Sequence, residues 1–373
     1  MTEHAVLFEE RAAGGGKRIA FAQLNAEKSL NALNQTMIDL LRPRLAAWAE
    51  DPAIACVVLS GSGDKAFCAG GDIIGLYRAM REHPGGPNPL VERFFETEYR
   101  LDYQIHTYPK PILCWGHGIV MGGGLGLMAG ASHRVATERS RIAMPELGIG
   151  FFPDVGASWF LNRMPGRLGL YLGLTGSTLN ATDALYAGLA DYFVPAAQRD
   201  AVFAALTETV WSNDAEHNHQ QLSLLLRGFA DASRDARPES KILQHLELIE
   251  HVTDYHSVAA ILEVLQAGRQ DDEWIAAGVK ALEYASPIAA SVFLEQHRRG
   301  RYLSLKEAFQ LEFSMAMQFT RRHDFAEGIR ALLVDKDRQP RWQPASLAEV
   351  SAAEVDAHFQ LPADLEPSPL ADL

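Results

Sequence analysis

In the first half of the chain, short apolar runs alternate with stretches of helical spacing. Five apolar runs bounded by turn residues predict strands, at residues 18–24, 55–61, 111–120, 133–137 and 191–195. Between the first two runs, apolar residues recur at helical spacing from Met37 to Trp48, which indicates an amphipathic helix. We expect Pro43 to kink or restart this helix, because proline lacks the N–H that a helix interior uses. Strands separated by helices are typical of βαβ units, so about residues 1–200 are predicted to be α/β.

From about residue 205 the strand signals fade and helical patterns replace them. Four segments carry such patterns, at residues 201–211, 241–252, 258–268 and 304–319. Polar segments at 212–220 and 234–240 are expected to connect helices, and PGGPNP at 84–89 is predicted to be a mobile loop. The sequence therefore predicts two parts, an α/β core over residues 1–205 and a helical region over residues 206–373.

Composition and charge narrow the class of function. Of the 373 residues, 47% are hydrophobic and 22% are charged, which is ordinary for a soluble globular enzyme. The excess of 47 acidic over 34 basic residues gives a net charge of −13, which argues against nucleic acid or an anionic membrane as partner. An anionic small molecule remains compatible with this charge, because local arginines and helix N-termini can bind one.

Cysteine usage and the N-terminus point to a compartment. Cys56, Cys68 and Cys114 are odd in number and have no CxxC spacing, which fits reduced thiols better than disulfides. The first residues include acids and no apolar segment typical of a signal peptide. No apolar run approaches the length of a membrane span. These features predict a protein of the cytoplasm.

Two glycine-rich turns each follow a predicted strand and precede a helical pattern. Gly70 and Gly71 stand before Asp72, and three glycines occupy residues 122–124. Taken singly, the first could be an ordinary turn in which Asp72 caps a helix, and the second could serve close packing of a helix on a sheet. The second turn matches neither GxGxxG nor GxxxxGK[ST], which disfavours dinucleotide and P-loop sites. Together, the two turns can offer one N–H each to a shared carbonyl oxygen, an arrangement known as an oxyanion hole.

Carboxylates occur in two apolar segments. Glu146 and Asp154 lie in MPELGIGFFPDVG, where a buried acid is costly unless it has a partner or a chemical role. If the two lie close together, their repulsion raises one pKa and lets them divide acid and base roles. In FFETEY, Glu98 stands four residues after a phenylalanine, so it is a better inward-facing candidate than Glu96.

Other chemistries find little support in the sequence. His217 and His219 are predicted to be loop residues, because no HxxxH spacing or carboxylate frame accompanies them, and no metal site is expected. The GxSxG motif is absent, which disfavours a serine thioesterase of the α/β-hydrolase kind.

Several ordered motifs resemble the enoyl-CoA hydratase/isomerase (crotonase) superfamily, and within it the 3-hydroxyisobutyryl-CoA hydrolase family. They are SLNALN at 29–34, KAFCAGGDI at 65–73, HGIVMGGGLGL at 117–127 and MPELGIGFFPDVG at 144–156, and the likeness continues through 174–194 and 321–350. The resemblance implies a crotonase-like spiral of βαβ units with a helical C-terminal region. It also implies hydrolysis of a short 3-hydroxyacyl-CoA thioester, foremost 3-hydroxyisobutyryl-CoA in valine breakdown. Coenzyme A is then part of the substrate, no separate cofactor is expected, and like subunits would form a trimer or hexamer.

The same resemblance assigns roles to residues of this chain. Glu146 would be the principal catalytic carboxylate, as nucleophile or general base, and Asp154 would assist with water or proton transfer. Glu98 would contact the acyl end of the substrate. The N–H groups of Gly71 and Gly123 would hold the thioester oxygen. The positions implied for coenzyme A binding are Lys28, Leu30, Ala66, Ala69, Gly70 and Asp72.

Three departures from the family pattern affect what can be carried over. Gly126 stands where hydratases of the superfamily have a second glutamate, which disfavours hydration. Ala26 and Glu27 stand where the family often has Arg-Pro, so phosphate contacts from this segment are in question and Lys28 is the local substitute. Leu147 stands where the hydrolases often have threonine, which leaves the exact acyl group open.

Three alternatives to the hydrolase remain at the level of sequence. One is an enoyl-CoA hydratase/isomerase, or another acyl-CoA enzyme of the superfamily, that uses Glu146 alone. A second resembles a dehalogenase branch in which the aspartate at the position of Asp154 is the nucleophile. The third is a non-catalytic relative, such as a scaffold or ribosome-associated protein.

Overall fold

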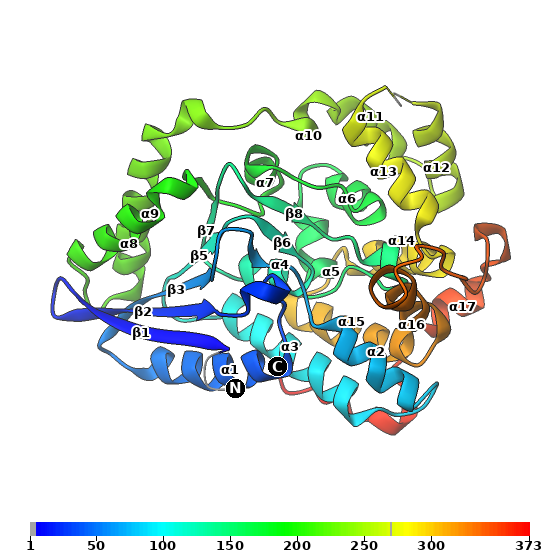
Figure 1. Cartoon of the computed structure of the whole chain (residues 1–373), viewed down its shortest axis with the longest axis horizontal. Helices are drawn as coiled ribbons and strands as arrows, with labels where there is room; N and C mark the ends of the chain where they lie inside the picture. Colours follow the sequence, from blue (N-terminus) through cyan, green and yellow to red (C-terminus); the bar gives the residue numbers. More distant parts are fainter. Residues whose placement is uncertain (1–4, 269–270) are drawn as a thin grey trace. The chain divides into compact units, whose positions relative to one another are not determined.

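The computed structural model describes residues 5–268 and 271–373 (Figure 1). Residues 1–4, part of the segment in which no signal peptide is predicted, lie outside the described residues. Within the described ranges the strands are β1 Val6–Ala13, β2 Lys17–Leu24, β3 Ile54–Gly61, β4 Ala66–Cys68, β5 Ile112–Gly116, β6 Ile119–Met121, β7 His133–Ala136, β8 Arg141–Ala143 and β9 Tyr192–Phe193.

The strands form two sheets, and the chain alternates between them. The larger sheet has the order β1-β2-β3-β5-β7-β9, and the smaller has the order β4-β6-β8. β1 and β2 are antiparallel, whereas β2 with β3, β3 with β5, β5 with β7 and β7 with β9 pair in parallel. Three times, in β3–β4, β5–β6 and β7–β8, the chain passes from the larger sheet directly to the smaller one. This repeated passage produces a spiral of strands and helices.

Helices cover both faces of the larger sheet. One face packs on α8 (Arg199–Glu208) and α9 (Ala215–Ala232), where buried Trp115 and Trp211 join the apolar residues of β2, β3 and both helices (Figure 1). Alternate residues of a strand point to opposite faces, so Ala22 and Leu24 face the other way. They meet Leu41 and Leu45 of α1, which spans Gln35–Glu50. Two further helices of the described chain pack on the strands: α4 Gly123–Ala129 contacts β4 and β6 of the smaller sheet, and α7 Ala181–Ala187 contacts β9 of the larger one.

Contacts divide the chain into two compact units built from interleaved segments. The first unit contains residues 1–71, 104–142 and 179–241, and the second contains residues 72–103, 143–178 and 242–373. The second unit is mainly helical. Its helices are α2 Ile73–Glu82, α3 Pro89–His106 (up to residue 103), α5 Ala157–Phe160, α6 Leu168–Thr175, α10 Lys241–Gln244 (from residue 242), α11 Leu246–Val252, α12 Val258–Ala267, α13 Glu273–Tyr284, α14 Pro287–Gly300, α15 Leu305–Thr320, α16 His323–Ile329 and α17 Ala352–Ala357.

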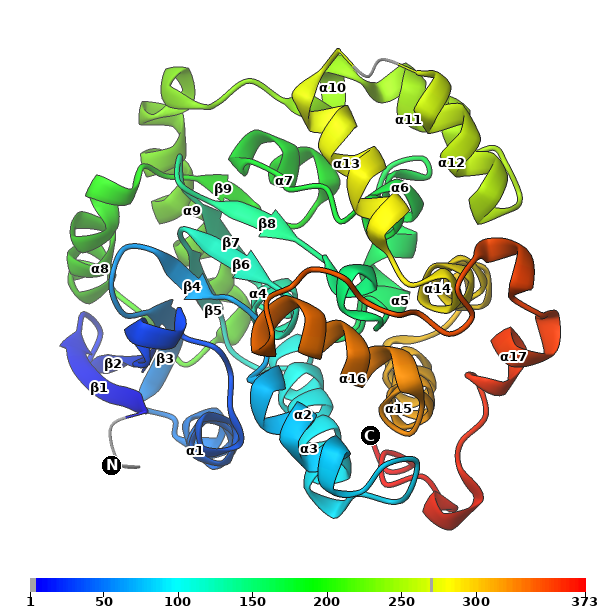
Figure 2. The same ribbon diagram turned by 45° about the vertical axis from the view of Figure 1, so that its right-hand side comes forward.

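The C-terminal helices of the second unit pack closely on its central loops. α14, α15 and α16 lie together in Figure 2, where they are coloured yellow to orange. α15 contacts α5, and α16 contacts the 3-10 turn at Glu146–Ile149. Gly328 of α16 permits this approach, because a Cβ there would collide with the backbone of Ile149. The helical region therefore supports the segment that carries the predicted catalytic acids.

The predicted α/β core and the helical pattern after residue 205 are confirmed, with local corrections. The run at 111–120 is not one strand: it is β5 and β6, which belong to different sheets, and Gly118 turns the chain between them with φ +59°. Strands β1, β4 and β8 escape the sequence analysis because they are short or carry a mixed polar pattern. The two-part division at residue 205 stays a prediction.

Two predicted helix boundaries differ from the structure. α1 does not restart at Pro43 but runs unbroken through it, because its apolar face from Met37 to Trp48 is buried and holds the helix together; a kink at Pro43 stays a prediction. The polar stretch at 212–220 is only partly a connector, since α9 begins at Ala215 and the side chain of Asp214 caps it. Polarity there reflects an exposed first turn of a helix.

His217 and His219 accordingly lie in a helix and not in a loop. The ring of His219 stacks on that of His133, with centroids 5.6 Å apart.

Candidate functional site

The two glycine turns of the first unit lie side by side. Gly71 follows β4 and Gly123 follows β6, and these two strands are parallel neighbours. Gly122 has φ +48° and ψ −127°, a conformation that side chains disfavour, and it precedes α4. A Cβ on Gly124 would run into the carbonyl of Cys68, and Gly70 has φ +111°, a conformation that other residues rarely adopt. Glycine is therefore required at Gly124 by close approach and at Gly70 by backbone conformation.

The N–H groups at these turns are suited to bind a carbonyl oxygen. Gly123 is the first residue of α4, so its N–H is one of the donors that a helix leaves without an intrahelical partner. The turn around Gly71 is held by the preceding loop: the Leu33 N–H donates to the Gly70 oxygen at 2.8 Å, and the Ala69 N–H donates to the Leu30 oxygen at 3.1 Å.

Asn31 organises the predicted coenzyme A segment of the same unit. It is 1% exposed and adopts φ +56°. Its amide donates to the backbone oxygens of Ser62 and Ala66, both at 2.9 Å, and its side-chain oxygen accepts from the Ala26 N–H. The structure thus brings five of the positions predicted for coenzyme A together in this unit: Lys28, Leu30, Ala66, Ala69 and Gly70. Asp72 belongs to the second unit, where it precedes α2 without a side-chain capping bond.

A cluster of buried acids forms the core of the second unit's candidate site. Glu98 and Asp102 lie one turn apart on α3, Glu146 begins a 3-10 turn, Asp154 precedes α5, and Glu312 lies on α15. All five are at most 6% exposed. Glu98 points inward as predicted, whereas Glu96 carries the ion pair with Arg100 on the more exposed side.

Hydrogen bonds fix two members of the cluster. The Tyr99 hydroxyl donates to Asp154 Oδ2 at 2.7 Å, and both groups are buried. Glu312 accepts the N–H of Gly156 and the N–H of Ser158, each at 2.7 Å. Among the described residues, by contrast, neither carboxyl oxygen of Asp102 has a hydrogen-bond partner, and the same is true of Glu146 Oε2.

Burial sets the protonation of these acids. It raises the pKa of Asp154 to about 7, although the hydrogen bond from Tyr99 opposes the rise. The pKa of Glu146 is raised well above its usual value by burial and then by the charge of Asp154. Glu98 and Asp102 also have pKa values raised well above the ordinary range, by burial and by neighbouring acids. Because the charge of Asp154 contributes to the raised pKa of Glu146, the two acids titrate as an interacting pair.

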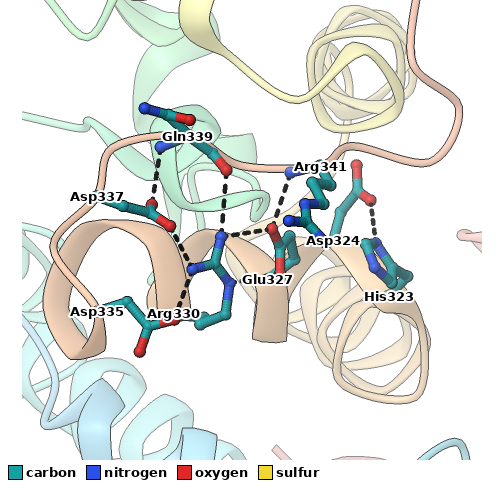
Figure 3. A network of polar contacts seen from close by, with 8 residues as sticks. All are labelled: His323, Asp324, Glu327, Arg330, Asp335, Asp337, Gln339 and Arg341. Carbon is teal, nitrogen blue, oxygen red and sulfur yellow. Dashed lines mark hydrogen bonds and ion pairs between the residues drawn. The ribbon is translucent and has the colours of Figure 1, made fainter.

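The 3-10 turn that carries Glu146 is supported by α16 and the chain after it. Figure 3 shows how Arg330 gathers Glu327, Asp335 and Asp337 at the end of α16. Glu327 also accepts the Arg341 N–H at 2.8 Å, which ties the segment after residue 338 back to the helix. Further along, the Asp324 carboxyl accepts the N–H of residue 343 at 2.8 Å. This network fastens the helix on which the Glu146 turn rests.

Sequence reasoning missed four polar residues of the second unit that the fold places around the acids: Tyr99, Asp102, Gln296 and Glu312. Two had a signal. Asp102 follows Glu98 by four residues and so shares its helix face. Glu312 stands within FQLEFSMAMQF, where a lone acid among apolar residues marks burial.

Other features of the described residues bear on chemistry. Cys56, Cys68 and Cys114 are buried and form no disulfide. In the ranges 5–268 and 271–373, no three His, Cys, Asp or Glu residues are grouped so that they could hold a metal ion. No helix in the described part of the chain combines the length and apolarity needed to cross a membrane.

Comparisons with known proteins agree on one family. The family model described as Enoyl-CoA hydratase/isomerase matches residues 19–359. A Gallus gallus protein named mitochondrial 3-hydroxyisobutyryl-CoA hydrolase is 38% identical over 90% of this chain and 85% of its own. A Neurospora crassa protein named small ribosomal subunit protein mS47 is 37% identical over 88% of this chain and 66% of its own. A crystal structure titled carnitinyl-CoA dehydratase, from Mycobacterium thermoresistibile, is 36% identical, covers 97% of this chain and 98% of its own, and has a TM-score of 0.84.

The prediction of a cytoplasmic protein is wrong by this comparison, because the vertebrate relatives are named as mitochondrial. That prediction rested on reduced cysteines and on the lack of a secretory signal. Neither feature distinguishes the cytoplasm from the interior of a mitochondrion.

Proposed function

Because the chain belongs to the enoyl-CoA hydratase/isomerase family, we propose that it is a thioester hydrolase that acts on 3-hydroxyisobutyryl-CoA or a closely similar 3-hydroxyacyl-CoA. The observation that carries this proposal is the buried pair of acids, Glu146 and Asp154, in a chain that has Gly126 on α4 where a hydratase would need a second glutamate. The corresponding metabolic role is the release of 3-hydroxyisobutyrate from its coenzyme A thioester during valine breakdown.

The reaction breaks the C–S bond of the thioester and forms a C–O bond to an oxygen that derives from water. We assign the N–H groups of Gly71 and Gly123 to the thioester oxygen, on which negative charge develops. One such donor is typically worth about 3–4 kcal/mol in the transition state. The closely approaching turns that carry these groups support the assignment.

Glu146 is the proposed catalytic carboxylate. Its raised pKa makes the ionised form a stronger base than an ordinary glutamate. It either attacks the carbonyl carbon, so that an anhydride forms and water later opens it, or removes a proton from water that attacks directly. In both routes the coenzyme A thiolate leaves and takes a proton. Asp154 is the group we assign to exchange that proton, since its pKa of about 7 lies near neutral pH.

The acyl end and the coenzyme A portion are assigned to other residues. Glu98, buried on α3, would contact the 3-hydroxyl group; burial and the charge of Asp154 raise its pKa, which favours the protonated form that can both donate and accept a hydrogen bond. Lys28 is exposed beside the loop organised by Asn31 and would meet the negative phosphates. We propose no further cofactor. Assembly into trimers or hexamers remains a proposal from the family resemblance.

The first experiment measures thiol release from 3-hydroxyisobutyryl-CoA and hydration of crotonyl-CoA by the same preparation. We expect thiol release without hydration, and its loss in both Glu146→Ala and Asp154→Ala. Hydration without thiol release would instead assign the chain to the lyases of the family. Absence of both reactions across a panel of acyl-CoA thioesters, together with no heat of binding in calorimetry, would leave a non-catalytic role.

A further inference from the structure

The residue after Asp154 has an unusual backbone conformation. Val155 has φ +54°, and it is followed by Gly156 with φ +92°. A β-branched residue at positive φ is a genuine outlier, because its side chain crowds the following carbonyl. Such conformations persist only where the surrounding structure imposes them, and they concentrate at functional sites.

Two side chains from the C-terminal helices hold this turn from both ends. On α15, one oxygen of Glu312 accepts the Gly156 N–H and the other accepts the Ser158 N–H, each at 2.7 Å. On α14, the amide of Gln296 donates to the Pro153 oxygen at 2.7 Å and to the Ser158 hydroxyl at 2.9 Å. Glu312 and Gln296 are both 0% exposed.

A carboxylate is the side chain that this arrangement requires. Two backbone N–H groups approach the same side chain, so both of its terminal atoms must be acceptors. A glutamine would present one oxygen and one NH2 group, and the NH2 group would face an N–H donor. Glu312 therefore does more than fill space in the core between α15 and α5.

We propose that Glu312 is a positioning residue for Asp154: by clamping the Gly156 and Ser158 N–H groups, it imposes the Val155 conformation and so aims the Asp154 carboxyl. Gln296 fixes the other end of the same turn. Glu312 acts through the backbone and not by contact with substrate. The inference deepens the proposed function, on which it rests, and it assigns a task to helices that lie more than 130 residues further along the chain.

The surroundings of the clamp are acidic. Glu312 interacts electrostatically with three buried titratable groups: Asp154, Asp102 and Tyr99. Burial raises the pKa of Glu312 to about 8, against the two N–H bonds that stabilise its charged form. A change at Glu312 is therefore expected to alter the pH profile of Asp154 as well as its position.

The test compares the Glu312→Gln variant with a double variant that also carries Val155→Gly, which removes the backbone strain at position 155. We expect Glu312→Gln to lower kcat for thiol release by about 100-fold with little change in KM, the scale of loss that follows a misplacement of about 1 Å. Glycine adopts positive φ freely, so Val155→Gly in the Glu312→Gln protein is expected to restore at least part of kcat. A purely structural role for Glu312 predicts no recovery of kcat, because Val155→Gly relieves strain in the turn but does not replace the packing and hydrogen bonds that Glu312 supplies in the core.

Two further variants keep the test interpretable. Gln296→Met removes the neutral half of the clamp and should lower kcat in the same direction by less, which preserves a test if Glu312→Gln does not fold. Asp183→Asn is the matched control: Asp183 is a buried acid of the first unit that accepts the Ser240 hydroxyl and the Asn180 N–H. We expect it to lower the melting temperature and leave kcat within about twofold, because its hydrogen bonds to Ser240 and Asn180 lie within the first unit and do not involve the turn after Asp154. An equal loss of kcat in the control, or no rescue by Val155→Gly, would overturn the proposal.

Crystal structures of the wild-type and Glu312→Gln proteins separate this inference from the proposed function. If the wild type releases no thiol, the hydrolase proposal fails, and the clamp is then judged by geometry alone. We expect Val155 to leave positive φ and the Tyr99–Asp154 hydrogen bond to break in the variant. A variant in which the turn keeps both features would refute the clamp, whatever the activity.

Discussion

Replacement of Tyr99 by phenylalanine isolates one interaction of the proposed acid pair. The variant keeps the buried ring and removes only the hydroxyl that donates to Asp154 Oδ2 at 2.7 Å. This hydrogen bond stabilises the charged form of Asp154 and so lowers its pKa, whereas burial raises it to about 7. Without the hydroxyl, burial is less opposed and the pKa must rise.

The size of the effect follows from the strength of such a bond. A hydrogen bond to a charged group contributes about 1.5–3 kcal/mol, and one pKa unit corresponds to about 1.4 kcal/mol. The Asp154 midpoint is therefore expected to move up by about 1 to 2 pH units. The direction is the same whether Asp154 acts as a base or as an acid, because either limb of the pH profile follows its pKa.

The assay is kcat/KM for thiol release between pH 5 and pH 10, with fits to the ionisation midpoints. Tyr108→Phe is the matched control, since the Tyr108 hydroxyl donates its hydrogen bond to the backbone oxygen of Leu45 and not to a carboxylate. The control should leave every midpoint in place. A Tyr99→Phe midpoint that stays fixed or moves to lower pH, with activity still measurable, would refute the assignment of that limb to Asp154.

Three further predictions concern stability and backbone contact. Burial and nearby acids raise the pKa of Asp102 in the folded state, so the stability of the wild type falls as the pH rises from about 4, the pKa in the unfolded chain, towards the raised folded value. Asp102→Leu should therefore raise the free energy of unfolding by about 1–3 kcal/mol at pH 8 and by less at pH 5. Urea titrations at the two pH values measure this difference. Gly328→Ala should lower the free energy of unfolding by about 1–3 kcal/mol through overpacking against the turn that carries Glu146, and it should lower kcat. Gly228→Ala, in open space on α9, should raise the free energy of unfolding by about 0.5–1 kcal/mol and leave kcat unchanged. Equal effects of the two substitutions would contradict the packing argument. Gly124→Ala should push the two glycine turns apart and abolish most thiol release while coenzyme A binding, measured by calorimetry, persists; full activity would exclude the oxyanion assignment.

Local patterns were sufficient to predict much of the fold. The buried strands β2 and β3 are continuous apolar runs, and α1 has apolar residues at helical spacing, so both signals are contained in a few neighbouring residues. The same holds for the glycine turns, whose composition permits a close approach that side chains would block. Pattern failed where an element is short, as in β4, or where a run crosses between sheets, as in β5 and β6.

The chemical groups of the candidate site can be recognised in the sequence: Glu146 and Asp154 in an apolar segment, Glu98 on the inward face of α3, and the glycines at positions 71 and 123. The protonation and orientation of these groups depend on how the chain folds. The pKa of an acid depends on its burial and on charges that arrive from distant segments, so no local pattern can supply it. The clamp on Asp154 has the same origin, because the Glu312 oxygens meet the Gly156 and Ser158 N–H groups only after α15 has packed on α5.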